Sequence, residues 1–327
     1  MEEENLEIID RGLLSEANGD ESEIIVIKER KNRTGVLRQT TKTKPARDVS
    51  AKVLDYLGTV KVTTSFKTSN PKAWLMQSIL NELGYTLKPD GFFGQLTEKE
   101  VKKFQADHGL VDDGIVGRAT WSELIYQGKR RITNSTISEQ DFKDAAADLG
   151  VEVAVVKAVT EVEAGGRGYV FSNHPTILFE SHVFWKELKK RGVTPSKYKD
   201  KDILNQKWAQ GKAYYKGGVA EHARLQKARL INTDAANASA SWGLFQIMGN
   251  NYAVCGCKSV GVFVKRMCKS EGEQLKLFVA FIKNNHLDGY LQKKQWAKFA
   301  ARYNGAGYKE NRYDTKLEKA YNKYKKQ

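Results

Sequence analysis

The chain has 327 residues and a formal net charge of +15, with 40% hydrophobic and 10% aromatic residues. This length can bury the core of one large domain or two smaller ones, and the apolar fraction is ordinary for a globular protein. No stretch reaches the roughly 20 apolar residues of a membrane-spanning helix. The acidic start MEEENLEIID also lacks the basic and apolar regions of a secretory signal. We therefore expect a protein made in the cytoplasm, without stable membrane insertion.

The positive charge has two interpretations, a solubility feature or an anionic partner such as nucleic acid, a membrane surface or a bacterial wall polymer. The basic residues are spread over the second half of the chain, in LKKRG, KYKDKD, KKQWAK and NKYKKQ. Because no nucleic-acid-binding motif accompanies them, they do not favour sequence-specific recognition of nucleic acid. We expect no nucleic-acid partner, and we expect a monomer.

Residues 1–66 differ from the rest of the chain. An acidic start is followed by KERKNRTGVLRQTTKTKPARD, which is basic, rich in threonine and poor in apolar residues. Low hydrophobicity with high charge is typical of a disordered or weakly structured tail, because little apolar surface is available to offset the entropy of ordering. We assign no role to a short helix or strand near VSAKVLDYLGTV.

Residues 67–128 contain an internal repeat. The segment DGFFGQLT at 90–97 returns at 113–120 as DGIVGRAT. Each copy is expected to form a tight turn that opens a helix, with glycines that permit positive φ and a threonine that caps the helix. Apolar residues at helical spacing precede the first copy and lie between the two copies. The pattern predicts a compact unit of three helices.

This order of features, with a helix that ends in Phe104-Gln105 between the two copies, resembles the type 1 peptidoglycan-binding domain found beside many wall hydrolases. The alternative is that the repeat is only the turn chemistry of a small helical bundle. The resemblance implies peptidoglycan as the partner of this domain. The residues to which it assigns wall binding are Trp74, Asp90, Gly91, Gly94, Asp113, Gly114 and Gly117.

Residues 137–327 are expected to be mostly helical, and their first candidate catalytic residue is Glu163. In VEVAVVKAVTEVEAGG, Glu163 ends an apolar stripe that includes Val155 and Val159, just before glycines that should end the helix. Burial beside apolar neighbours raises the pKa of a carboxyl group, as the general acid of a glycosidase requires. The alternative is a surface residue at a helix end, which is the interpretation for Glu161, expected to pair with Lys157.

The segments TEVEAGGRGY and HPTILFESHVFW resemble the N-acetylmuramidase domain of modular phage endolysins. SASWGLFQIM at 239–248 and ARYNGAGY at 301–308 are similar to segments of the wider lysozyme and lytic-transglycosylase superfamily. The four segments occur in the family's order. The resemblance implies a mainly α protein, in which a lysozyme-like catalytic domain follows the small three-helix domain, with Glu163 as the acid and no cofactor.

The same segments supply candidate substrate-binding residues. Gln246, Ser241 and the backbone around Gly243 are expected to hydrogen-bond the N-acetyl group or hydroxyls of a sugar, unless this segment is only the start of a buried helix. Tyr303 and Asn304 supply donors and acceptors that can orient the acid or the substrate. The alternative for these two residues is a turn with local capping.

Glu180 is the candidate second carboxylate, because it follows the apolar run Ile177–Phe179 and a buried acid needs a partner or a function. It can activate water, hold the substrate, or pair structurally with His182 or Arg167. Asp234 is a weaker candidate, and a single essential acid is also compatible with the superfamily.

The cysteines Cys255, Cys257 and Cys268 cannot all pair within one chain, which is consistent with a reducing compartment. Their spacing matches no standard zinc site, even with His286 as a fourth ligand. We therefore expect free thiols and no metal.

The leading functional hypothesis is a peptidoglycan glycosidase that cleaves between N-acetylmuramic acid and N-acetylglucosamine. A lytic transglycosylase would cut the same bond with the muramic acid C6 hydroxyl in place of water. An alternative of another class is a non-catalytic wall-binding or virion structural protein, against which Glu163 counts. The expected absence of a signal peptide is consistent with an endolysin held in the host cytoplasm until its release to the wall.

Overall fold

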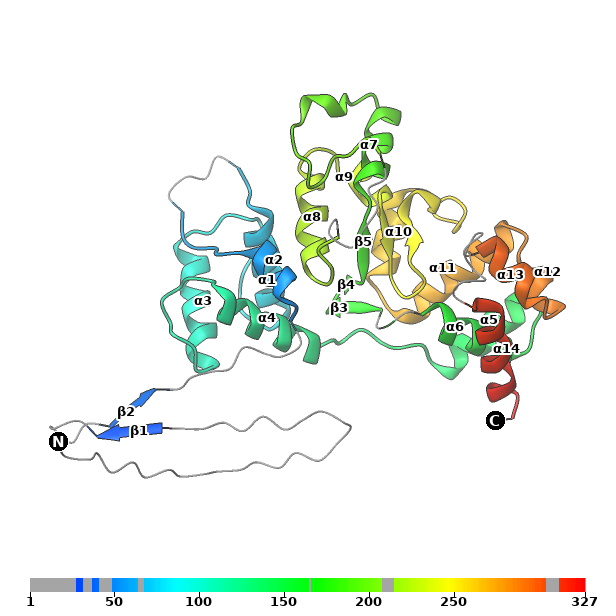
Figure 1. Cartoon of the computed structure of the whole chain (residues 1–327), viewed down its shortest axis with the longest axis horizontal. Helices are drawn as coiled ribbons and strands as arrows, with labels where there is room; N and C mark the ends of the chain where they lie inside the picture. Colours follow the sequence, from blue (N-terminus) through cyan, green and yellow to red (C-terminus); the bar gives the residue numbers. More distant parts are fainter. Residues whose placement is uncertain are drawn as a thin grey trace.

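The computed structural model describes residues 28–31, 37–40, 49–63, 68–164, 166, 168–207, 215–303 and 312–326. A short hairpin of β1 (Lys28–Lys31) and β2 (Leu37–Thr40) precedes two helical domains, which lie side by side in Figure 1. Within the described residues, no helix is both long enough and apolar enough to cross a membrane.

The small domain consists of α1 (Ala51–Leu57), α2 (Pro71–Glu82), α3 (Gln95–Asp107) and α4 (Arg118–Arg130). α2 begins at Pro71, which suits the first helical position because proline has no N–H group that would lack a partner there. The Asn70 side chain accepts hydrogen bonds from N–H groups of the first turn. The three predicted helices are therefore present, with α1 as an additional element.

One buried glutamine holds each copy of the repeat. The Gln77 amide donates to the Asp90 carboxylate and the Thr97 hydroxyl at 3.0 and 3.1 Å and accepts the Gly91 N–H at 2.7 Å. Gln105 makes the same contacts in the second copy. The predicted helix-capping role of the threonines is wrong, because the caps are Gly94 and Gly117 and no side chain bonds there.

The glycines of the repeat divide into two kinds. Gly91 and Gly114 have φ of 79° and 76°, as the predicted tight turn requires. Gly94 and Gly117 have φ of −95° and −92°, so their backbone does not need the freedom of glycine. The expectation of positive φ thus applies to only one glycine of each pair.

The small domain begins earlier than the predicted boundary at 67. Val53, Leu54 and Leu57 of α1 are buried in the same core as α2 and α3. Val60 pairs with Val116 through two backbone hydrogen bonds of 3.1 and 2.8 Å. The end of the expected tail is therefore part of the folded domain, because its few apolar residues face a core that α2 to α4 leave open.

The large domain is mostly helical. Its helices are α5 (Glu139–Leu149), α6 (Val153–Glu163), α7 (Ser181–Lys190), α8 (Ala220–Arg229), α9 (Thr233–Ala238), α10 (Val260–Met267), α11 (Glu271–Asn284), α12 (Asp288–Gln292), α13 (Trp296–Tyr303) and α14 (Tyr313–Tyr324). Short 3-10 turns lie at η1 (Pro195–Lys197) and η2 (Gly249–Asn251). The C-terminal α14 packs along α6, and the two lie close together in Figure 1.

Two small sheets complete the large domain. β3 (Tyr169–Phe171) pairs with β4 (His174–Pro175), and β5 (Ile177–Phe179) pairs antiparallel with β6 (Ala240–Trp242), which in turn pairs with β7 (Ile247–Met248). The second sheet joins two of the segments that the sequence singled out, because the strand before Glu180 lies beside the strand of the SWGLFQ segment.

The two domains share part of one core. Phe171 of β3 is 1% exposed and, with Val219, Ala220 and Ala223, belongs to the same apolar cluster as the residues of the small domain. α8 lies against α2, as Figure 1 shows. The position of the small domain relative to the large domain is therefore set by buried apolar contacts.

Candidate active site

Glu163 is the last residue of α6, at the end of the predicted apolar stripe. Val155 and Val159 are 1% and 2% exposed, whereas Glu163 is partly buried. The helix ends with Ala164 as its C-cap, whose N–H donates to the Thr160 carbonyl at 2.8 Å. The carboxyl group is therefore placed where the buried side of the helix meets the surface.

The other acid of this helix has a different environment. Glu161 is exposed, forms an ion pair with Lys323 at 2.7 Å, and accepts a hydrogen bond from the Tyr324 hydroxyl at 2.6 Å. These contacts hold the pKa of Glu161 below its usual range. The predicted partner Lys157 instead pairs with Glu139 at 2.7 Å, because α14 brings its own cation to Glu161.

Tyr303 at the end of α13 is electrostatically coupled to Glu163. Burial and the negative charge of Glu163 both raise the pKa of Tyr303. Its hydroxyl donates to the Phe245 carbonyl at 3.1 Å, and its ring stacks on Phe299 with centroids 5.7 Å apart. Tyr303 is therefore a fixed neutral hydroxyl near Glu163, and its proton is donated to the SWGLFQ segment. Asn304 lies outside the described residues.

Gln246 is held in a strained turn between β6 and β7. It is exposed and has φ of 48°, a conformation that is uncommon for a residue other than glycine. Its amide donates to the carbonyls of Gly243 and Thr176 at 2.7 and 3.2 Å and accepts the Ser241 hydroxyl at 2.7 Å. These bonds fix the side chain at the surface, and the buried Ser241 supplies one of them.

Gly243 has a structural role that the sequence did not predict. Its N–H donates to the Thr176 carbonyl at 2.8 Å, and its carbonyl accepts the Gln246 amide, so both backbone groups already bond within the protein. With φ of 71°, a Cβ here would lie 2.6 Å from Oε1 of the buried Gln274. Gln274 in turn accepts the Leu244 N–H at 2.8 Å. The turn therefore requires glycine for conformation and for space.

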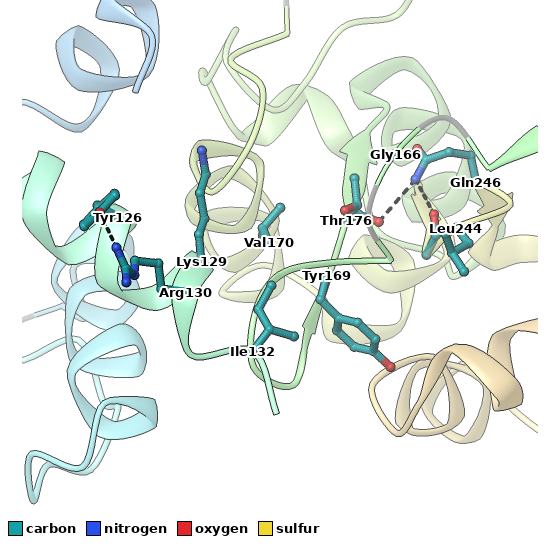
Figure 2. Close-up of a pocket in the computed structure, with 11 residues that line it drawn as sticks. Tyr126, Lys129, Arg130, Ile132, Gly166, Tyr169, Val170, Thr176, Leu244 and Gln246 are labelled. Carbon is teal, nitrogen blue, oxygen red and sulfur yellow. Dashed lines mark hydrogen bonds between the residues drawn. The ribbon is translucent and has the colours of Figure 1, made fainter. Parts of the chain in front are cut away.

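A pocket of about 500 Å³ lies beside this turn, between the two domains. Its lining includes Gln246, Gly243 and Thr176, together with Gly166, which follows Glu163 closely in the chain. Figure 2 shows the side chains of α4 on one side of this pocket and Gln246 on the other. We call it the shared pocket, and its volume is in the range of ligand sites. The residues that line it from the small domain and its connection are Tyr126, Lys129, Arg130 and Ile132.

Glu180 is engaged by neighbouring side chains. It is the N-cap residue of α7, directly after β5, and its side chain is 16% exposed. The Tyr215 hydroxyl donates to both of its carboxylate oxygens at 3.0 Å, and His182 Nδ1 lies 3.3 Å away. Glu180 is not among the residues that line the shared pocket. Its predicted pairing with His182 is present, and Arg167 lies outside the described residues.

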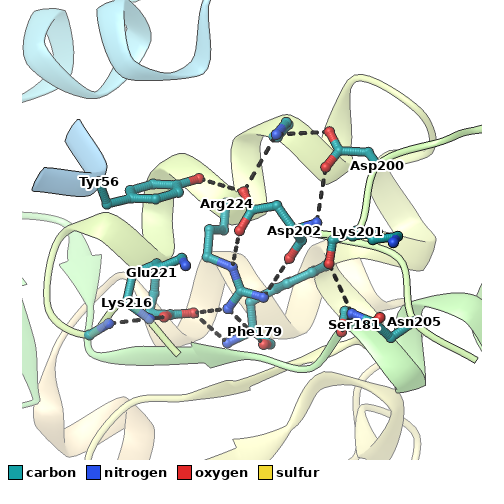
Figure 3. A network of polar contacts seen from close by, with 12 residues as sticks. Tyr56, Phe179, Ser181, Asp200, Lys201, Asp202, Asn205, Lys216, Glu221 and Arg224 are labelled. Carbon is teal, nitrogen blue, oxygen red and sulfur yellow. Dashed lines mark hydrogen bonds and ion pairs between the residues drawn. The ribbon is translucent and has the colours of Figure 1, made fainter. Parts of the chain in front are cut away.

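A buried ionic network fixes β5, the strand directly before Glu180 (Figure 3). Glu221 and Arg224 are both fully buried and are 2.8 Å apart. Glu221 accepts the Phe179 N–H at 3.1 Å, and Arg224 donates to the Asp202 carbonyl at 2.7 Å. The Tyr56 hydroxyl of α1 donates to the Asp202 carboxylate at 2.7 Å, so the network also reaches the small domain. Such a buried pair is costly to break one partner at a time.

The described lining of the shared pocket includes neither Glu163 nor Tyr303, and it includes none of the remaining candidates. Asp234 is exposed in the first turn of α9, where an acid is favoured by the helix dipole. Cys255 and Cys257 are buried free thiols, and burial raises the pKa of Cys255 to about 12. Burial also raises the pKa of Cys268 to about 11. The described residues contain no cluster of three histidine, cysteine or acidic side chains that could hold a metal.

The candidate wall-binding residues lie in two different environments. Trp74 is partly buried at the junction of the domains, with its ring 5.9 Å from that of His174. Asp113 and Gly117 line a second pocket of about 350 Å³ on the small domain. Leu110 and Val111 line the same pocket, and Val111 is 77% exposed. The second copy of the repeat, and not Trp74, therefore borders an accessible hollow.

Comparison with protein families identifies the large domain. Residues 152–325, more than half of the chain, match the N-acetylmuramidase family. The chain belongs to the N-acetylmuramidase family. Residues 71–124 match the peptidoglycan binding domain family. The predicted organisation, in which a peptidoglycan-binding domain precedes a mostly helical muramidase domain, is thus confirmed, as is the mainly α fold class.

Two individual proteins are similar to this chain. The solved structure of a Burkholderia AP3 phage endolysin is 38% identical, covers 82% of this chain and 98% of its own, and superposes with a TM-score of 0.54. An uncharacterized protein in the bpoA1 3' region of Kitasatospora aureofaciens is 44% identical over 61 residues, 18% of this chain. The match spans about half, 51%, of that curated relative. The family and the solved endolysin together support a glycoside hydrolase of the lysozyme type.

Proposed function

We propose that this protein is a phage endolysin that cleaves the peptidoglycan bond between N-acetylmuramic acid and N-acetylglucosamine. The proposal rests on the position of Glu163, which lies at the end of a buried apolar helix face within the residues that match the N-acetylmuramidase family. A carboxyl group at such a boundary can hold its proton yet reach a substrate. The AP3 phage endolysin, similar over nearly its whole length, supports the role at the wall.

Glu163 acts as the general acid in this proposal. It protonates the glycosidic oxygen as the bond breaks and positive charge develops on the sugar ring. Tyr303 stays neutral because its pKa is raised, and with its proton donated to the Phe245 carbonyl its hydroxyl oxygen remains free to accept a hydrogen bond near the acid. The exposed Gln246, fixed by three hydrogen bonds, is positioned to contact the N-acetyl or hydroxyl groups of the substrate.

The second carboxylate of the proposal has a supporting role. Both oxygens of Glu180 already accept the Tyr215 hydroxyl, and His182 lies beside one of them. A carboxylate held in this way is suited to positioning α7 and the loop that contains Tyr215. We therefore assign the proton transfer to Glu163 alone.

The small domain is proposed to hold the enzyme on its polymer. Its second pocket, bordered by Asp113 and the exposed Val111, offers polar and apolar contacts for a wall component. Attachment raises the local concentration of substrate at the catalytic domain, even where each single contact is weak.

Replacing Glu163 with glutamine tests the assignment. Glu163→Gln keeps the shape of the side chain but removes the transferable proton, so lysis of purified sacculi should fall by at least 100-fold. Glu161→Gln, on the same helix, is the matched control and should keep activity within about twofold of the wild type, because Glu161 pairs with Lys323 at the surface. Equal lysis by the wild type and Glu163→Gln would refute the proposal.

Product analysis separates the hydrolase from the transglycosylase, which the Glu163 assignment alone leaves open. Mass spectrometry of the digest should find reducing muramic acid ends. Products with 1,6-anhydromuramic acid would instead show that the C6 hydroxyl is the attacking group, and reducing glucosamine ends would show cleavage of the other glycosidic bond. A digest without products would favour the non-catalytic alternative.

A further inference from the structure

The small domain supplies two cations to the shared pocket. Lys129 and Arg130 belong to the last turn of α4, and both line the pocket that also contains Gln246. In Figure 2 they lie across the pocket from Gln246. The pocket therefore joins the last helix of one domain to the proposed sugar-contacting turn of the other.

These cations have no acidic partner among the described residues. Lys129 is partly buried and Arg130 is exposed, and neither forms an ion pair there. Arg130 is oriented by Tyr126, whose hydroxyl accepts its guanidinium and whose ring lies 5.3 Å from it. The described lining of the pocket includes no aspartate or glutamate. Two positive charges without a counter-charge, at a hollow of ligand size, favour an anionic group there.

The cations are held at a fixed place relative to the large domain. Gly128 of α4 is buried against Phe171 of β3, and a Cβ at this glycine would lie 3.3 Å from the Phe171 Cβ. The next residue, Lys129, is thus one position away from a buried contact between the domains. Because Phe171 is buried in the shared core, α4 cannot move from the pocket without opening that core.

We propose that Lys129 and Arg130 form a subsite for the carboxylates of the peptide stems that peptidoglycan bears on its muramic acid residues. This inference rests on the proposed function, because it takes peptidoglycan to be the substrate. The sugars of the strand are neutral, so the stems supply the anionic groups nearest to the bond that is cut. Gln246 then contacts sugar at one end of the pocket while the two cations contact the stem at the other.

The experiment compares two substrates with the full-length chain. One consists of uncrosslinked glycan strands that keep their peptide stems, and the other of the same strands after carbodiimide coupling to methylamine has converted the stem carboxylates to neutral amides. An amidase is not used, because removing the stems would leave a free lactyl carboxylate on each muramic acid. The double variant Lys129→Gln/Arg130→Gln should show about a tenfold rise in KM on the unmodified strands with kcat nearly unchanged, because two partly exposed charge contacts are lost. On the amidated strands its KM should equal that of the wild type. Added salt should raise the wild-type KM only on the unmodified strands.

A charge-matched control is available on the same domain. Lys88 and Lys99 are exposed and do not line the shared pocket. Lys88→Gln/Lys99→Gln therefore lowers the net charge equally and should change KM less than twofold on either substrate. An unchanged KM for the pocket variant, or an equal rise on both substrates, would overturn the inference.

Two other outcomes identify where the reasoning fails. Cations in the last turn also stabilise a helix through its dipole, so a lowered melting temperature with a parallel loss of kcat on both substrates would mean that Lys129 and Arg130 only support α4 and would overturn the subsite. A wild-type chain that releases no reducing ends from either substrate would refute the proposed function itself.

Discussion

Replacing Gly243 tests whether the turn between β6 and β7, which carries Gln246, requires glycine. An alanine there meets two separate costs, a left-handed backbone at φ of 71° and a Cβ placed 2.6 Å from the Gln274 amide oxygen. The backbone cost is about 1–2 kcal/mol. Moving Gln274 also breaks its bonds to the Leu244 N–H at 2.8 Å and the Met267 carbonyl at 2.9 Å. Leaving such buried groups unpaired costs about 1–3 kcal/mol each.

Gly192, after α7, provides the matched control. Its φ of 72° is within 1° of that of Gly243, but a Cβ there has no atom within 4 Å. Gly192→Ala should therefore lose only the backbone contribution, about 1–2 kcal/mol of unfolding free energy. Gly243→Ala should lose about 2–4 kcal/mol more, measured by urea denaturation at neutral pH.

The double variant Gly243→Ala/Gln274→Ala separates the two contributions further. Because both single changes remove the same hydrogen bonds of Gln274, their costs should not add. If Gly243→Ala were as stable as Gly192→Ala within about 1 kcal/mol, the contact with Gln274 would have no energetic weight, and the account of this turn would be refuted.

Gln105→Leu should lower the free energy of unfolding by about 1–3 kcal/mol, because the buried Gly114 N–H loses its acceptor; it should weaken sedimentation with peptidoglycan while cleavage of short soluble fragments persists. Burial lowers the pKa of His174 to about 4, and burial also lowers the pKa of His222 well below its usual value. As the pH falls from 6.5 toward 4, these histidines bind protons in the unfolded chain but stay neutral in the folded protein. The free energy of unfolding, measured by urea denaturation, should therefore fall by up to about 1.4 kcal/mol per pH unit for each histidine. His222→Gln should reduce this slope in the same measurement.

The parts of the fold that depend on local sequence were predictable. The helix that ends at Glu163 follows from its apolar spacing, and the turns at Gly91 and Gly114 follow from glycine in a repeated loop. The role of Gln77 and Gln105 was not visible in the same repeat. Gln77 lies 14 residues before the glycine it binds and Gln105 only 9, so the two glutamines share no common spacing.

Contacts between distant segments could not be predicted from periodicity. Trp74 belongs to an apolar helix face, but the sequence does not reveal that part of this face meets His174 of the other domain. The partner of Glu161 was also unpredictable from the sequence, because Lys323 lies 162 residues away and reaches Glu161 only when α14 packs on α6. Gln274 was also missed, since nothing in its own segment indicates that it supports the turn at Gly243.

Because the two domains share a core, neither is easily replaced by a domain from another protein. Val219, Ala220 and Ala223 of the large domain complete the apolar cluster of the small one, and Phe171 packs against the backbone of Gly128. A chimaera that joined this small domain to another catalytic domain would expose the apolar surface of the small domain to water and promote aggregation. Engineered lysins based on this chain should therefore carry β3 and the start of α8 together with the wall-binding helices, as one transplantable unit.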